Sequence, residues 1–124
     1  MKYLLYVSTL IARLLHDHDH HARVKAWVKG KELAVCPITE LGFLRVSTQA
    51  AGLDINDARK ILTGWLAQSK PKFIPCDIHA VDGAAAPEGG QTTDYYLANL
   101  ADKHGMEWAT LDEDSKHPAA FVVP

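Results

Sequence analysis

The sequence lacks a strong excess of charge of either sign. Its 13 lysines and arginines nearly balance its 15 aspartates and glutamates, so the formal net charge is -2. This balance gives no general attraction to nucleic acid, and RNA binding would require a local basic patch. The lysines and arginines are spread along the chain rather than gathered in one run.

Long apolar runs, paired cysteines and glycine-rich phosphate loops are also missing. The apolar run from Tyr3 to Leu15 is interrupted by polar residues and has no small-residue cleavage site, so we expect a cytoplasmic protein that does not enter membranes. Cys36 and Cys76 lack the CxxC spacing, which favours two buried, reduced thiols over a disulfide or a redox pair. The absence of GxGxxG and GxxxxGK[ST] argues against a nucleotide-binding domain.

What the sequence does contain is an alternation of short apolar segments with amphipathic ones. The 48% hydrophobic composition of the 124 residues suffices for one core, so we expect a single domain over residues 1–124. Strands are predicted at 3–7, 32–37, 72–76, 107–111 and 120–123, and helices at 10–15, up to 28, 38–48, 53–69 and 92–105. This alternation predicts an α/β fold with a parallel sheet and helices on both faces.

Side chains that accept hydrogen bonds from free helix N–H groups predict where the helices begin. The predicted caps are Ser8 or Thr9, Asp17 or Asp19, Thr39, and Thr92 or Thr93.

Three carboxylates follow predicted strands or open predicted helices. Glu40 comes a few residues after the second strand, Asp94 lies in the first turn of the last helix, and Asp112 directly follows the fourth strand. The carboxyl ends of parallel strands meet at one edge of a sheet, where ligands bind in such folds. Oxygen ligands favour a hard ion, Mg²⁺ or Mn²⁺, although a single acid in a first turn is more often a capping residue.

The segments "CPITELGFLRVST" and "TTDYYLANLADKHGMEWATLDED" resemble PIN-domain proteins, specifically the VapC-type toxin ribonucleases of bacterial toxin–antitoxin pairs. The likeness extends from "KYLLYVSTLIARLL" to "AFVVP". It implies a three-layer α/β/α fold with a five-stranded parallel sheet. It also implies a Mg²⁺- or Mn²⁺-dependent endoribonuclease, a homodimer, and a cognate antitoxin that blocks the site.

The resemblance assigns metal-binding and catalytic roles to Glu40, Asp94 and Asp112, with Thr93 as the small hydroxyl residue before the third acid. The family's first acid and its asparagine fall on Tyr6 and Ser8. A phenol with an ordinary pKa of about 10 is neutral at pH 7 and offers one weak oxygen. We therefore predict a metal-dependent ribonuclease whose activity is weakened by Tyr6; the alternative is a nuclease-dead module that binds an antitoxin or RNA.

Other side chains have two interpretations each. Tyr95, Tyr96 and Trp108 could stack on RNA bases, but we favour places in the core or in a dimer interface. Arg45 either points toward a phosphate or lies on the solvated surface.

Overall fold

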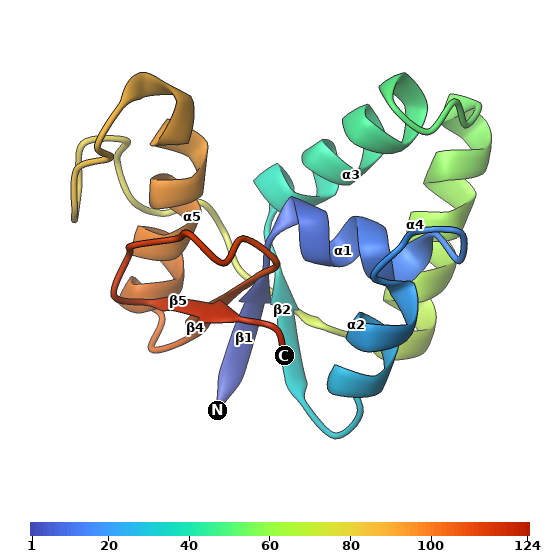
Figure 1. Ribbon diagram of the computed structural model, residues 1–124, viewed down its shortest axis with the longest axis horizontal. Helices are drawn as coiled ribbons and strands as arrows, with labels where there is room; N and C mark the ends of the chain where they lie inside the picture. Colours follow the sequence, from blue (N-terminus) through green and yellow to red (C-terminus); the bar gives the residue numbers. More distant parts are fainter.

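The computed structural model describes residues 1–124, and Figure 1 shows its strands and helices. The elements are β1 (Lys2–Leu5), α1 (Val7–Leu14), α2 (His21–Trp27), β2 (Glu32–Val35), α3 (Pro37–Gln49), α4 (Ile55–Ser69), β3 (Lys72–Phe73), the 3-10 turn η1 (Gly89–Gln91), α5 (Thr92–Lys103), β4 (Glu107–Thr110) and β5 (Ala120–Val122). The predicted alternation of strands and helices is confirmed.

The five strands form one parallel sheet in the order β3-β2-β1-β4-β5. Leu4 of β1 stands opposite Ala34 of β2 on one side and Trp108 of β4 on the other. The chain adds strands outward from β1 in one direction and then returns to add β4 and β5 on the other side. Ligand sites in open α/β sheets lie where this direction changes, which here is the carboxyl edge between β1 and β4.

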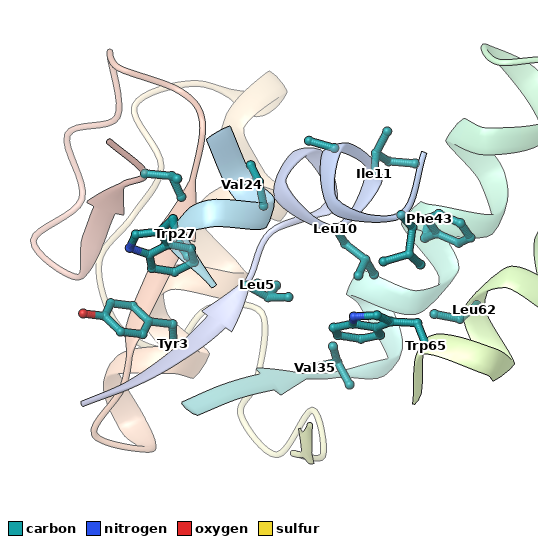
Figure 2. Close-up of a cluster of buried hydrophobic side chains, with 14 of the residues drawn as sticks. Tyr3, Leu5, Leu10, Ile11, Val24, Trp27, Val35, Phe43, Leu62 and Trp65 are labelled. Atoms are coloured by element: carbon teal, nitrogen blue, oxygen red, sulfur yellow. The ribbon is translucent and has the colours of Figure 1, made fainter. Parts of the chain in front are cut away.

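The side chains of β1 alternate between the two faces of the sheet, as in any strand. Tyr3 and Leu5 belong to a buried cluster with α1 to α4, whereas Leu4 belongs to a second cluster with α5. Figure 1 shows α5 apart from the other four helices, and Figure 2 shows Trp65 of α4 beside Val35 of β2 in the first cluster. The predicted three-layer α/β/α architecture is therefore confirmed.

The predicted helix caps are wrong at four of the helices, because the hydroxyl groups serve other contacts or the helices start elsewhere. Helix α1 begins at Val7, so Tyr6 is its N-cap and not part of the strand. Thr9 Oγ1 donates to the carbonyl of Ala109 at 2.9 Å, and Thr39 Oγ1 donates to that of Leu5 at 2.9 Å. The N-caps of α1, α2, α3 and α5 are Tyr6, His20, Cys36 and Gln91, and none of them makes a side-chain cap hydrogen bond.

The third strand is shorter than predicted. Only Lys72 and Phe73 pair with β2, and Phe73 is exposed. Beyond Pro75 the chain leaves the sheet, so Cys76 is exposed, which contradicts the prediction of two buried thiols; Cys36 is buried, and both cysteines are free. None of the helices is both long and apolar enough to cross a membrane.

Candidate functional site

Tyr6 lies at the carboxyl end of β1, where the strand passes into α1. Its backbone N–H donates to the carbonyl of Ala109 in β4 at 3.0 Å, and its own carbonyl accepts from the N–H of Leu10 at 3.0 Å. Its ring meets that of Trp108 edge-on, with 4.9 Å between the centroids. These contacts fix the phenol at the edge of the sheet between β1 and β4.

The hydroxyl of Tyr6 donates a hydrogen bond of 2.5 Å to Oδ1 of Asp94 in the first turn of α5. Burial, the hydrogen bond to Asp94 and the nearby negative charges of Asp94 and Asp112 hold the pKa of Tyr6 well above its ordinary value of 10. Arg45 acts in the opposite direction but more weakly. The phenol is therefore a neutral donor to the carboxylate at physiological pH.

A groove of about 780 Å³ opens beside this hydrogen bond. Tyr6, Ser8, Thr93 and Asp94 line it, together with Arg45 from α3. The hydroxyl oxygen of Ser8 is buried and has no hydrogen-bond partner within the protein. The structure therefore brings Ser8, Thr93 and Asp94 together with Tyr6, and it places the exposed Arg45 at the rim of the same groove.

Asp112 follows β4 and lies close enough to Tyr6 to raise its pKa. Its backbone N–H donates to Oγ1 of Thr110 at 3.1 Å, and its Oδ1 accepts from the N–H of Asp114 at 2.9 Å. The turn thus holds Asp112 at the carboxyl edge of the sheet, on the same side as Asp94.

Glu40 stands apart from this pair. It lines a neighbouring groove of about 370 Å³ between α3 and α4, which shares Leu41 with the groove beside Tyr6. Burial raises the pKa of Glu40. The structure therefore brings Asp94 and Asp112 to Tyr6 but leaves Glu40 facing the adjacent groove.

The carboxylates supply the oxygen donors that Mg²⁺ prefers, but their arrangement does not suit a tightly held ion. No group of three or more histidine, cysteine, aspartate or glutamate side chains lies close enough together to hold a metal. Asp94 already accepts a hydrogen bond from a bulky neutral phenol. As they stand, these residues do not fit a strong divalent-metal site.

Fold and groove together define a three-layer α/β protein with acidic side chains at the strand ends where the sheet order changes direction. The PIN domain family model matches residues 7–120. The chain is 36% identical to Ribonuclease VapC38 of Mycobacterium tuberculosis (strain ATCC 25618 / H37Rv) over 118 residues, which cover 88% of this chain and 84% of that protein. It is 31% identical to Ribonuclease VapC29 of Mycobacterium tuberculosis (strain CDC 1551 / Oshkosh), with 100% of this chain and 98% of that protein covered.

The chain belongs to the PIN-domain family, and within it to the VapC proteins. Its fold is also similar to a crystal structure of VapBC2 from Rickettsia felis bound to a DNA fragment from their promoter. The TM-score is 0.65 at 13% identity, with 97% of this chain and 96% of that chain covered, which supports the fold.

The contact between Tyr6 and Asp94 was not predicted, because the two residues are 88 positions apart. Two signals pointed to their proximity: their common place at the carboxyl edge of the sheet, and the family resemblance, which puts Tyr6 where the first acid of the site stands. His18, which follows α1 and also lines the groove, was not predicted as part of the site.

Proposed function

We propose that this chain is a PIN-domain endoribonuclease, the toxin of a VapBC-type toxin–antitoxin pair, and that Tyr6 weakens its activity. The observation that carries the proposal is the placement of Asp94 and Asp112 beside Tyr6 at the carboxyl edge of a PIN fold. The curated relatives of this chain are named ribonucleases, and they align over most of its length.

The residues assigned to catalysis and metal binding are Glu40, Asp94 and Asp112, with Thr93 and Ser8 in supporting positions. The proposed cofactor is Mg²⁺ or Mn²⁺, which these carboxylates would hold weakly and which would supply Lewis-acid chemistry for phosphodiester cleavage. Because Tyr6 occupies the place of an anionic ligand and engages Asp94, we expect weak metal affinity.

The proposed partners are an RNA substrate, a cognate antitoxin protein and a second copy of this chain. The support for an antitoxin is the likeness in fold to a VapBC complex, and the support for RNA is the name of the curated relatives. Such a protein would act in the cytoplasm, where its RNA substrates are found.

Tyr6→Asp tests the role of the phenol. The change replaces a neutral donor with an anionic oxygen ligand, so we expect Mn²⁺ affinity measured by calorimetry, and cleavage of a labelled RNA, to rise by roughly tenfold or more. Circular dichroism checks that the variant keeps its fold. Unchanged metal affinity and cleavage in a folded Tyr6→Asp protein would show that the phenol is not what limits activity.

Tyr6→Phe is the matched control, since it keeps the ring and removes the hydroxyl. It frees Asp94 from its hydrogen bond without adding a ligand, so metal affinity should rise far less than in Tyr6→Asp. Adding Asp94→Asn to Tyr6→Asp should return both cleavage and metal affinity to the level of the unaltered protein or below.

The hydrogen bond from Tyr6 to Asp94 favours a second candidate function, a nuclease-dead PIN module that binds an antitoxin or RNA. In that case the unaltered protein retains labelled RNA in a filter-binding assay but does not cut it at any Mn²⁺ concentration. Measurable cleavage that disappears in Asp94→Asn would exclude this second function.

A further inference from the structure

A second pocket, of about 440 Å³, lies at the edge of the sheet opposite Tyr6, where the strands begin. This is the edge near the N-terminus in Figure 1. Glu32 is the one acidic residue in its wall. The pocket also carries five cationic side chains, Lys2, Arg13, Lys31, Lys70 and Lys72, which we call the basic cluster.

The sequence did not predict the basic cluster because its members come from separate parts of the chain. Lys2 opens β1, Arg13 lies in the last turn of α1, and Lys72 opens β3. Parallel strands place their first residues at one edge, and the helices return to that same edge. The fold therefore concentrates positive charge in a protein whose net charge is -2.

No member of the basic cluster makes an ion pair within the molecule. The ion pairs in the structure join Asp77 to Lys103 and to His104, and they lie elsewhere. Arg13 Nε is buried and makes no hydrogen bond. A buried donor without a partner costs free energy, so the fold holds Arg13 at the pocket wall at some cost in stability.

Lys70 adds an independent observation from the backbone. It caps α4 in the left-handed region, at φ 47° and ψ 53°, and no other residue except glycine has a positive φ. Glycine or asparagine adopts this conformation at lower cost than lysine. Strained backbone of this kind is found preferentially at functional sites, where a particular side chain is needed.

The negative C-terminal ends of helices offset part of the positive charge of the basic cluster, but not all of it. Helices α1, α2 and α4 each contribute a residue near their C-terminal end to the pocket wall: Arg13, Val28 and Lys70. Each C-terminus carries roughly half a negative charge. Together with Glu32 these offset about half of the charge on the five cations, and a net positive potential remains.

We propose that the basic cluster binds a ligand that carries several phosphate groups. An arginine flanked by lysines is the combination that recognises phosphate oxygens, because the guanidinium provides a planar fork of donors and the ammonium groups provide point charges. The site lies at the opposite edge of the sheet from Tyr6 and Asp94, and it does not depend on the proposed ribonuclease activity.

Binding of inorganic triphosphate and of a short single-stranded RNA tests the proposal. Both titrations are made by calorimetry with EDTA present, so that neither metal nor cleavage contributes. Lys31→Glu combined with Lys72→Glu should weaken binding by roughly tenfold or more. For RNA the slope of log affinity against log salt should also fall by about 1.4, or about 0.7 for each lysine.

Lys60→Glu combined with Lys116→Glu is the matched control, because it makes the same change in net charge at exposed positions outside the pocket. It should leave triphosphate affinity nearly unchanged. Lys70→Asn removes one charge while keeping a residue that tolerates the left-handed backbone, so it should weaken binding without lowering the thermal midpoint.

Saturable triphosphate binding that only the pocket variants lose supports a small phosphorylated ligand. Binding of RNA alone, with the same dependence on the pocket lysines, supports a nucleic-acid backbone as the source of the phosphates. If neither ligand binds, or if the pocket pair and the control pair weaken binding equally, the proposal is wrong.

Discussion

Tyr6 joins three parts of the chain that are distant in sequence. Through its backbone it bonds to Ala109 of β4, through its ring it packs on Trp108, and through its hydroxyl it holds Asp94 of α5. An aspartate in the same position would meet Asp94 and Asp112 as a like charge and would need a cation to compensate. The phenol removes that repulsion. At this position, the residue that stabilises the fold without a metal is therefore the one that lowers metal affinity.

A double-mutant cycle with Tyr6→Phe and Asp94→Ala measures this contact. Hydrogen bonds to charged groups contribute about 1.5 to 3 kcal/mol, and the half-exposed position favours the lower end, so Tyr6→Phe should lower the free energy of unfolding by about 1.5 kcal/mol. Urea denaturation gives both single changes and the double change. If the two single effects add to within about 0.3 kcal/mol, the residues are not coupled and the contact does not stabilise the fold.

At the scale of whole elements, the crossing of α1 and α3 depends on one glycine. A Cβ atom added at Gly42 of α3 would stand 2.3 Å from Cγ2 and 3.2 Å from Cβ of Val7, at the start of α1. Only a residue without a side chain permits this approach. Because α1 begins directly after Tyr6 and α3 carries Arg45, the crossing sets the width of the groove between them.

Gly42→Ala should therefore lower the free energy of unfolding by about 1 to 3 kcal/mol, as overpacking does in a closely fitted core. Gly64→Ala is the matched control in α4, where an added Cβ has no neighbour within 4 Å. Helix propensity predicts that Gly64→Ala stabilises the protein by up to about 1 kcal/mol. Thermal and urea unfolding of the two variants should shift in opposite directions, and a shift in the same direction would contradict the packing account.

The periodicity of the sequence was sufficient to predict the strands, the helices and the layers, because those depend on local patterns of burial. The helix starts were predicted less well, since Thr9 and Thr39 donate across the fold to strand carbonyls and are not available as caps. Of the site, the edge of the sheet was predictable but the contacts were not. Whether Glu40, Asp94 and Asp112 act together stays a prediction.

Across the whole molecule, Asn99 of α5 connects two segments that carry little regular structure. Its side chain exchanges hydrogen bonds with Ala84, donating to the carbonyl at 2.9 Å and accepting from the N–H at 3.0 Å. It also accepts from Nε2 of His117 at 2.7 Å, while Nδ1 of His117 accepts from the N–H of Ala119 at 2.9 Å. These bonds require the neutral imidazole with its proton on Nε2.

Stability should consequently depend on pH through His117. Burial lowers the pKa of His117 below its ordinary value of 6.5, and Asp102 opposes this shift more weakly. The unfolded chain then binds more protons, so this contribution is fully present above pH 6.5 and is lost as the pH falls toward the lowered value. The aromatic ring of Tyr95 also packs on His117, in an edge-on contact.

We would measure urea unfolding of the unaltered protein and of His117→Gln at about pH 7.5 and about pH 5. The difference between the two proteins separates the contribution of His117 from that of the other histidines. The unaltered protein should lose more stability between the two values than His117→Gln. Equal losses would mean that His117 is not held neutral by the fold.

The edge strands of the sheet are β3, which has two paired residues, and β5, which has three. An edge strand this short offers few free backbone groups, so another chain cannot readily pair with it. A lysine on an edge strand opposes such pairing further. Lys72 stands on β3 beside the exposed ring of Phe73. Copies of this protein should therefore resist fibril growth by strand addition.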